Sequence, residues 1–595
     1  MPRISRTDDN LFAFPKGAFL RNEKYVYVNV SNNYVSSSRR VTSGKGYTGH
    51  DSVCIGVLQN PKDKNNKMLY ANNKYKELFT EQELPDPPLF ADSISVGFNG
   101  WMAKVMESSG LSADLNEAFK DEEHVRLVLD LASYMISRES AVMQHFPAWA
   151  REHMLFSEDV SSDTMIGRFI RDTLSVSKIK LFRELWFKRN IGDGRVYLCY
   201  DSTNVNCQAR GVMIVQKGHA KDDATLPQVN TDYVVRQSDG LPLTYLHSPG
   251  SVTDIAQAQE MIEFIREAKK LTGIDVVICL ICDRGYISEK NVKDMDNSGI
   301  TYLLMLRSNF TLYKNLADQV IDTIKTYRNE ISCDDNDEKY GVTVECTLYE
   351  GGPVCYAHII WSNERYRNER GNAKETIARE RRKLENFIQS SKKKSLEEKE
   401  LEWVPKYFIL KTEPGTPKEE IQKKRGRGTG TITVKKPTVR LVGYEDNEEA
   451  INREIMKAGL MILISREEMT AETALHEYGK RDCVEKVFQA LKSHMGMDKI
   501  GVTTEEAMHG KGLIWFVASI LHALLFTGTS ELRISDKKHY TVPAMVDQLE
   551  AIKADKDLRM GNYKRRYKVT RTQSRILSQF GMNEKDIDDR IGQLD

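Results

Sequence analysis

A nearly continuous apolar run from Ile274 to Cys282 places the strongest constraint on the fold. Because it lacks polar alternation, such a run is typical of a strand buried on both faces, as in a parallel sheet. A second β-type run covers Val196–Tyr200, and further strands are predicted at Tyr302–Leu306 and Leu460–Ser465. Helical spacing from about 254 to 271 separates the first two runs. We therefore expect an α/β core, with a mixed sheet flanked by helices.

Each of the first two runs is followed directly by an aspartate, Asp201 or Asp283. If both strands open onto the same edge of the sheet, the two carboxylates can face one cleft. For Asp201 alone, a cap or turn role stays open, because the Ser-Thr-Asn that follows is also turn chemistry. Cys279 and Cys282 have C-x2-C spacing without a second pair nearby, so we interpret them as core thiols.

The stretch Tyr478–Lys492 is predicted to form an amphipathic helix with a polar stripe. At ~100° per helical residue, the stripe residues fall within an arc of roughly 60°; they are Tyr478, Arg481, Glu485 and Lys492. An apolar face beside them would pack into a core; it comprises Val484, Val487, Phe488 and Leu491. The helix would therefore present the Glu485 carboxylate at the edge of that core.

Asp201, Asp283 and Glu485 together match the needs of a two-metal phosphoryl-transfer site. Mg²⁺ prefers carboxylate oxygens and keeps several of its waters, and Mn²⁺ is an alternative ion for the same ligands. Two such ions about 4 Å apart can activate an attacking oxygen and stabilise a leaving one. We therefore predict that the three carboxylates are catalytic and hold two ions.

Contacts with DNA must come from local patches, because 86 Lys and Arg residues are balanced by 85 Asp and Glu. The first candidate patch precedes a GTGT run and comprises Lys423, Lys424, Arg425 and Arg427. A basic segment interleaved with tyrosine is the second candidate, and it includes Lys564, Arg565 and Arg566. A disordered loop for the first patch, and a solvated helix end for the second, remain alternatives. Arg39, Arg40 and Lys45 likewise suit either a phosphate contact or a solvated loop.

The sequence also carries expectations about the compartment. MPRISRTDDN lacks the apolar run of a signal peptide, and nine scattered cysteines do not resemble a disulfide framework. The apolar stretch Leu513–Phe526 is shorter than the ~20 residues of a membrane span and is predicted to be a buried helix. We expect a reduced, cytoplasmic protein without membrane contact.

Changes in residue pattern suggest six regions. We expect an N-terminal β-rich region with DNA-end contacts (1–90), a helical domain (91–190), the first part of the catalytic core (191–310), a β-rich insertion (311–457), the second part of the core (458–530) and a C-terminal helical basic region (531–595). The insertion would contain a charged helix from Arg370 to Glu402. The core would thus be assembled from two separated segments.

The spacing of Tyr478, Arg481, Glu485 and Lys492 resembles the Y-(2)-R-(3)-E-(6)-K signature of DDE transposases from bacterial insertion sequences, in the group related to insertion sequence four. Asp201-Ser202-Thr203 is similar to the D-x-T motif of these enzymes, and Asp283-Arg284-Gly285 to D-R-G. The G-x-x-K-D and P-G-x-x-x-D elements correspond to 218–222 and 249–254. The resemblance covers about 195–310 and 458–530.

This resemblance implies a ribonuclease-H-like core interrupted by an insertion. It also implies that Asp201, Asp283 and Glu485 hold the metals, while Tyr478, Arg481 and Lys492 hold phosphates of the element end; we place Arg284 among the DNA contacts as well. The enzyme would bind inverted-repeat ends, free a 3′-OH by hydrolysis and join it to target DNA in a cut-and-paste reaction. Work on two ends implies at least a homodimer on double-stranded DNA, in a bacterial cytoplasm at the nucleoid.

Two alternatives remain at this point. One is a ribonuclease-H-like nuclease that cuts without joining strands, and the other is a domesticated transposase that only binds DNA. Some members of the group flip a base onto a tryptophan of the insertion. Trp361 and Trp403 are the only tryptophans there, and for both we favour a role in the core.

Overall fold

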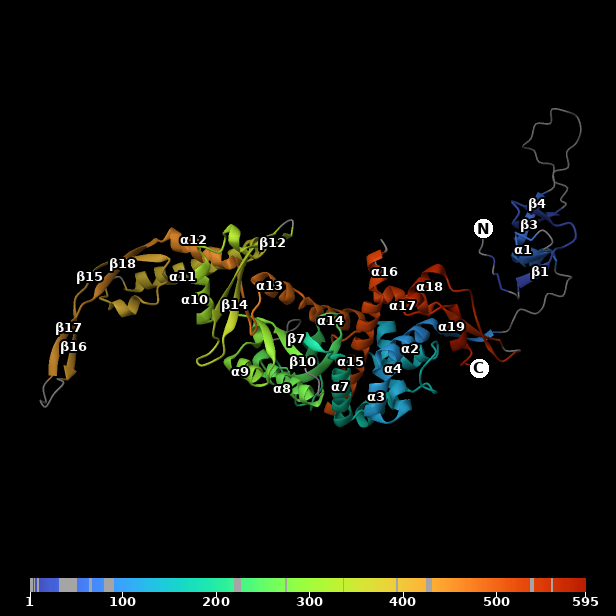
Figure 1. Cartoon of the computed structure of the whole chain (residues 1–595), viewed down its shortest axis with the longest axis horizontal. Coiled ribbons are helices and arrows are strands. Elements are labelled where there is room, and N and C mark those ends of the chain that lie inside the picture. The colour runs from blue at the N-terminus through green and yellow to red at the C-terminus, as the bar shows by residue number, and fades with distance from the viewer. Residues whose placement is uncertain are drawn as a thin grey trace, which may run out of the picture. The chain divides into compact units, whose positions relative to one another are not determined.

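The computed structural model describes residues 4, 6–7, 10–30, 51–63, 67–79, 90–218, 226–272, 276–334, 337–391, 394–423, 431–535, 540–557 and 560–594. The chain forms two compact units. Unit 1 comprises Met1–Val105, Pro147–Phe156 and Glu531–Asp595, and unit 2 comprises Met106–Phe146 and Ser157–Ser530. Unit 1 is therefore built from segments that are distant in the sequence, whereas only residues 147–156 separate the two segments of unit 2. Figure 1 shows the elements of the chain coloured by residue number.

Unit 1 contains an antiparallel sheet of five strands in the order β1-β5-β4-β3-β2. The elements are β1 (Leu11–Ala13), β2 (Phe19–Arg21), β3 (Tyr25–Val30), β4 (Asp51–Leu58), β5 (Met68–Ala71) and helix α1 (Asn73–Leu78). Alternation along β3 explains the sheet, because Val26 and Val28 are buried while Tyr25 and Tyr27 are half-buried on the other face. Val26 and Val28 pack into a small core with residues of β4, β5 and α1.

Unit 1 also contains a second sheet, in the order β21-β20-β6, that joins early and late parts of the chain. Its strands are β6 (Phe90–Ser95), β20 (Lys553–Asp557) and β21 (Tyr563–Arg565). Unit 1 also contains the helices α17 (Val542–Glu550), α18 (Arg571–Ser578) and α19 (Glu584–Ile591), together with most of α2 (Gly97–Ser109), of α5 (Phe146–Ala150) and of α16 (Ser530–Ser535). Trp101 and Phe580 pack edge to face at 5.6 Å. The region 531–595, predicted to be helical, thus contains two strands as well as helices.

Unit 2 is built on a mixed sheet of nine strands in the order β12-β13-β14-β19-β11-β10-β7-β8-β9. The strands are β7 (Gly194–Asn206), β8 (Gln228–Arg236), β9 (Pro242–Pro249), β10 (Val276–Cys282), β11 (Thr301–Met305), β12 (Glu330–Asp334), β13 (Asp337–Cys346), β14 (Cys355–Ser362) and β19 (Leu460–Ser465). β7, β10 and β11 are parallel, and the remaining pairs are antiparallel. The predicted mixed sheet is confirmed, and β10 is buried along nearly its whole length.

Unit 2 also contains the helices α3 (Leu111–Phe119), α4 (Glu122–Arg138), α6 (Asp163–Arg168), α7 (Val176–Asn190), α8 (Asp254–Thr272), α9 (Glu289–Asn297), α10 (Thr311–Val320), α13 (Ala471–Gly479), α14 (Asp482–His494) and α15 (Glu505–Gly528). Of these, α7, α9, α13, α14 and α15 contact strands of the sheet. Among the described residues, α15 is the one helix long and apolar enough to cross a membrane by length and composition. It is 72% buried over that window and contacts β9, α4, α7 and α14. A helix that is apolar on all sides is buried in a core, as the sequence predicted.

The region 311–457 contains both an extension of the central sheet and separate β structure. β12, β13 and β14 lengthen the nine-stranded sheet. Beyond them lie α11 (Asn363–Ser391), β15 (Phe408–Pro414) paired with β18 (Val439–Asp446), β16 (Lys418–Lys423) paired with β17 (Thr431–Lys436), and α12 (Glu448–Met456). The predicted charged helix thus begins seven residues earlier than expected and ends at Ser391. Leu384 and Ile377 of this helix pack into a local core with Phe408 and Leu441.

Candidate active site

The two aspartates lie where the parallel pairing of β7 and β10 ends. Cys282, the last residue of β10, is in register with Tyr200, so Asp283 directly follows β10 and Asp201 is the next residue of β7. β7 nevertheless continues to Asn206, because the antiparallel strand β8 pairs with it over that length. Asp201 is therefore a strand residue rather than the cap or turn residue that remained an alternative. Because β10 ends at Cys282, the edge of β7 that paired with β10 is no longer covered by that strand from Asp201 onwards.

The two oxygens of the Asp201 carboxylate have different partners. Oδ1 accepts the backbone N–H of Ser202 at 2.8 Å and the hydroxyl of Tyr286 at 3.1 Å. Oδ2 faces the Arg481 guanidinium, with Nη1 at 3.3 Å. Neutral donors therefore hold one oxygen in place, while the other oxygen faces a cation.

Asp283 caps the single-turn 3₁₀ helix Arg284–Tyr286. Its Oδ1 accepts the backbone N–H of Arg284 at 2.7 Å and the hydroxyl of Tyr478 at 3.4 Å. Arg307, just past β11, donates Nε to the Arg284 carbonyl at 2.6 Å and Nη2 to the next carbonyl. The Arg284 side chain itself is exposed. The turn thus fixes Asp283 and leaves a cation at the surface.

The predicted single helix over Tyr478–Lys492 is two helices, α13 and α14. Gly479 ends α13, and the i→i+3 bonds from Arg481 N to Tyr478 O and from Val484 N to Arg481 O tighten the connection. Glycine is a poor helix residue, and i→i+3 bonds wind the chain more tightly than α-helical bonds. The four stripe residues therefore do not lie on one continuous helix, although Glu485 and Lys492 share α14.

Arg481 joins Asp201 to Glu485. Its Nη2 lies 2.7 Å from Glu485 Oε1, and its Nη1 faces Asp201 Oδ2. The side chains of Arg481 and Asp201 are only 16% and 15% exposed, whereas Glu485 is 57% exposed. Lys492 lies half-buried in the last turn of α14. The structure thus brings the carboxylates of Asp201 and Glu485 against one guanidinium, and the charge of Asp283 acts on the same guanidinium.

Charge and burial act in opposite directions on Arg481. Burial by itself lowers the pKa of Arg481, but the interaction with the Tyr478 hydroxyl and the negative charges of Asp201, Asp283 and Glu485 outweigh it, so that this pKa is raised above its usual value. Burial, followed by the negative charge of Asp283, raises the pKa of Tyr478. Both groups therefore stay protonated at neutral pH. The guanidinium partly neutralises carboxylates that would otherwise repel one another.

The donor set fits a hard divalent cation. In the part of the chain that the structure describes, no three His, Cys, Asp or Glu side chains are grouped closely enough to hold a metal ion. The carboxylates of Asp201 and Glu485 are instead bridged by Arg481, which shows that a positive charge is accommodated between them. Carboxylate oxygens are the ligands that Mg²⁺ prefers, so the residues fit such an ion once the guanidinium leaves.

The predicted DNA contacts of the C-terminal region already have acidic partners within unit 1. Arg566 forms a two-pronged pair with Asp555, with distances of 2.7 Å and 2.8 Å. Arg565 pairs with Glu584 and Asp588, and Lys564 Nζ lies 3.6 Å from Asp557 Oδ2. A phosphate would have to compete with these carboxylates.

Several other predicted residues lie outside the described parts of the chain. These are Arg39, Arg40, Lys45, Lys424, Arg425, Arg427 and most of the element 218–222. Lys423 belongs to strand β16.

The two tryptophans of the insertion differ. Trp361 on β14 is 1% exposed, its Nε1 donates to the Met456 carbonyl at 3.0 Å, and Lys325 Nζ lies 3.9 Å from its ring centroid. The core interpretation is therefore confirmed for Trp361. Trp403 is 43% exposed and packs edge to face on Phe387 at 5.3 Å, so for this residue the core interpretation is wrong.

Sequence reasoning missed three residues beside the aspartates. Tyr286 directly follows the D-R-G motif, Arg307 follows β11, and the fully buried Asp232 lies opposite Ser202 on β8. Burial, together with nearby carboxylates, raises the pKa of Asp232 well above its usual value. Only Tyr286 had a signal in the sequence, namely its place three residues after Asp283.

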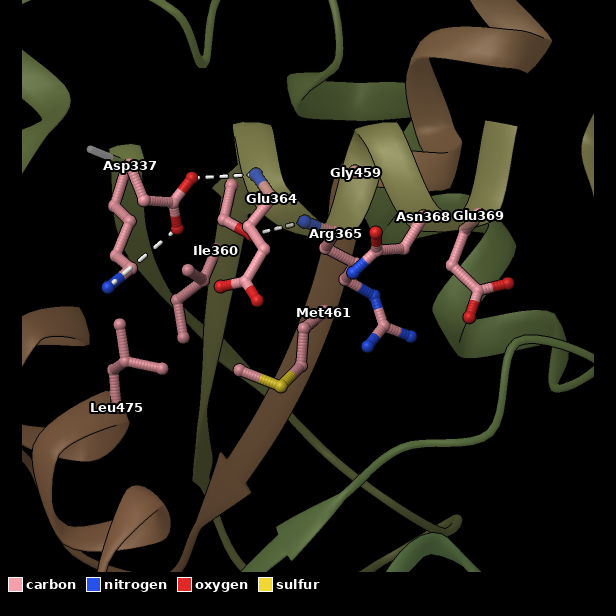
Figure 2. Close-up of a pocket in the computed structure, with 11 residues that line it drawn as sticks. Asp337, Ile360, Glu364, Arg365, Asn368, Glu369, Gly459, Met461 and Leu475 are labelled. Atoms are coloured by element: carbon pink, nitrogen blue, oxygen red, sulfur yellow. Dashed lines mark hydrogen bonds and ion pairs between the residues drawn. The ribbon is translucent and has the colours of Figure 1, made fainter. Parts of the chain in front are cut away.

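A pocket of about 320 Å³ lies between β13, β14, α11, β19 and α13 (Figure 2). Charged residues line one rim, where Asp337 accepts the backbone N–H of Glu364 at 2.6 Å and lies 3.8 Å from Lys339. Ile360, Met461 and Leu475 line the opposite side (Figure 2). None of the sequence-predicted site residues lines this pocket.

One comparison with known proteins covers the region that contains Asp201, Asp283 and Glu485. The protein-family model described as "Transposase DDE domain" matches residues 193–521, more than half of the chain. No curated protein shows significant sequence similarity. Among solved structures, the chain is similar to a piggyBac transposase in a synaptic complex with hairpin DNA, at 9% identity and a TM-score of 0.33, over 79% of this chain and 76% of that chain.

Proposed function

The chain belongs to the transposase DDE domain family and is a metal-dependent polynucleotidyl transferase of the transposase class, and we propose that it catalyses cut-and-paste movement of an insertion sequence. It binds the inverted-repeat ends of its element, hydrolyses a phosphodiester to free a 3′-OH, and joins that hydroxyl to target DNA. The observation that carries this proposal is that Arg481 pairs with both Asp201 and Glu485, while Tyr478, close to Arg481 in the chain, donates to Asp283. The Y-R-E-K spacing supports placement in the group related to insertion sequence four.

We assign the catalytic core to five strands of the central sheet. β7, β8 and β9 form an antiparallel meander, and β10 and β11 continue from β7 in parallel. This order supports a ribonuclease-H-like core, with the region between β11 and β19 as its insertion. Asp201 lies on β7, Asp283 directly follows the adjacent strand β10, and Glu485 on α14 is linked to Asp201 through Arg481.

In this proposal Asp201, Asp283 and Glu485 hold two Mg²⁺ ions. When bound, these ions activate the attacking oxygen and stabilise the leaving oxygen. Hydrogen bonds orient these carboxylates before any cation binds. Ser202 N–H and Tyr286 O–H donate to Asp201 Oδ1, and Arg284 N–H donates to Asp283 Oδ1. Fixing one oxygen of each carboxylate limits the rotation of the other oxygen before a cation binds.

Arg481 can exchange its partners in this scheme. Before cations and DNA bind, its guanidinium balances Asp201 and Glu485. Arginine also forms two-pronged pairs with phosphate, so a guanidinium released from the carboxylates can bind a phosphate of the element end. Lys492 on the same helix as Glu485, and the exposed Arg284, are proposed as further phosphate contacts.

Tyr478 requires a more specific assignment than a simple phosphate contact. Its side chain is buried, and its hydroxyl donates to Asp283 Oδ1. A phosphate can engage this phenol only if the phenol gives up that bond or the DNA backbone comes next to Asp283. We therefore propose that Tyr478 contacts DNA immediately beside the metal ligands. We also propose that the protein acts in the bacterial cytoplasm as a homodimer on two double-stranded DNA ends.

The decisive experiment combines the protein with duplexes carrying its element's ends, a supercoiled target plasmid and Mg²⁺. We expect 3′-ends cut at the element boundary, followed by products joined to the plasmid. Cut ends without joined product would instead establish a nuclease. Binding without cutting would establish a protein that has kept only DNA recognition.

A further inference from the structure

Tyr286 occupies a position that links the two aspartates. It ends the 3₁₀ turn that Asp283 caps, and its backbone N–H donates to the Asp283 carbonyl at 3.2 Å. Its side chain crosses to the neighbouring strand, where the hydroxyl lies 3.1 Å from Asp201 Oδ1 and 2.8 Å from Ser202 Oγ. One residue therefore connects the turn after β10 to the carboxylate on β7.

The turn that carries Tyr286 is held on several sides. Arg307 binds two of its carbonyls, and Asn291 Nδ2 donates to the Tyr286 carbonyl at 2.9 Å. A Cβ atom at Gly285 would lie 2.5 Å from Asp254 Oδ2, so glycine allows the Asp254 carboxylate to lie close against the turn. The Tyr286 ring packs on Tyr200, with centroids 4.7 Å apart. The phenol therefore has little freedom to leave Asp201.

A hydrogen bond from this phenol affects which oxygen of Asp201 is available. A phenol has one proton and keeps it at neutral pH, because the pKa of a phenol is ordinarily about 10. Ser202 Oγ, 2.8 Å from the phenol oxygen, has a proton of its own that it can donate to that oxygen, which leaves the phenol proton for Asp201. Oδ1 then has two donors, the phenol and Ser202 N–H. Oδ2 then remains as the oxygen that faces the cation position now taken by Arg481.

We propose that Tyr286 is a positioning residue of the metal site, whose hydroxyl orients the Asp201 carboxylate and couples it to the turn that carries Asp283. The inference rests on the proposed role of Asp201 as a metal ligand. Donors to ligating carboxylates typically change metal affinity 10- to 100-fold when they are removed. Tyr286 would therefore act through Asp201 without touching DNA or metal.

The test measures the affinity of the full-length protein for Mn²⁺ in the absence of DNA. Electron paramagnetic resonance reports how much Mn²⁺ is bound. Tyr286→Phe keeps the ring on Tyr200 and removes the hydroxyl. We expect about tenfold weaker Mn²⁺ binding, with an unchanged melting temperature of the metal-free protein. The matched control is Tyr302→Phe, which removes another buried hydroxyl, one that lies 3.2 Å from Cys355 Sγ; it should bind Mn²⁺ like the wild type.

Two further variants separate the possible failures. Asp201→Asn must weaken Mn²⁺ binding; if it does not, the proposed metal site itself is wrong. If Asp201→Asn weakens binding but Tyr286→Phe does not, or weakens it no more than Tyr302→Phe, the positioning role is overturned while the proposed function stands. If Tyr286→Phe does not fold, Ser202→Ala replaces it, because it removes the second anchor of the phenol. Weaker Mn²⁺ binding by Ser202→Ala supports the proposal, and unchanged binding overturns it.

Discussion

Replacing Arg481 by glutamine should make the metal-free protein less stable and its metal binding tighter. Glutamine removes the charge that lies 3.3 Å from Asp201 Oδ2 and 2.7 Å from Glu485 Oε1. Asp201 would then remain mostly buried without its cation, beside Asp283. A divalent ion would no longer compete with a guanidinium for these two oxygens.

The magnitude follows from the exposure of the two pairs. Breaking a buried ion pair by removing one partner costs about 3–5 kcal/mol, whereas an exposed pair contributes about 0.2–1 kcal/mol. The Arg481–Asp201 pair is nearer the first case and the Arg481–Glu485 pair nearer the second, because Glu485 is 57% exposed. We expect a loss of about 2–3 kcal/mol for the metal-free protein, discounted for partial solvent access.

The assay is thermal melting with and without Mn²⁺, together with direct Mn²⁺ titration. Mn²⁺ should raise the melting temperature of Arg481→Gln more than that of the wild type, since ligand binding stabilises the folded state by mass action. Lys480→Gln is the matched control, because it removes one neighbouring charge that pairs with Glu477 at 2.8 Å instead. Equal Mn²⁺ affinity of Arg481→Gln and the wild type would refute the idea that the guanidinium holds the cation position.

Three further predictions address the other site residues. Glu485→Ala should abolish cutting and leave binding of element ends largely intact in gel-shift assays; wild-type cutting would contradict the three-carboxylate assignment. Lys492→Ala should weaken end binding and lower the slope of log affinity against log salt by about 1, because each phosphate contact releases counterions; an unchanged slope would exclude a phosphate contact. For Asp232, burial raises the folded-state pKa, so wild-type stability should fall as the pH rises from the unfolded-state pKa of about 3.9 towards the raised value. Melting temperatures between pH 4 and 8 should show a smaller fall for Asp232→Asn, and parallel curves would contradict this.

Local patterns predicted much of the core correctly. The apolar run ending at Cys282 forms the buried strand β10, and Leu513–Phe526 lies within the buried helix α15. Both follow from side-chain character within a few residues of each position, which determines how a segment is buried. The strand containing Asp201 was predicted too short, because beyond Tyr200 it pairs with β8 and no longer with β10. The break between α13 and α14 was missed because one glycine and a tight turn interrupt an otherwise helical pattern.

The sequence by itself identified the candidate residues: two aspartates that follow apolar runs and a glutamate spaced from tyrosine, arginine and lysine. Only the tertiary structure decided which of their side chains contact one another. It places Arg481 against Asp201 across 280 residues of chain, and it makes Tyr286 a partner of the same carboxylate. Periodicity reports neighbours within a turn or a strand, whereas the partner of each carboxylate oxygen depends on how the sheet, the turn after β10 and α14 pack together.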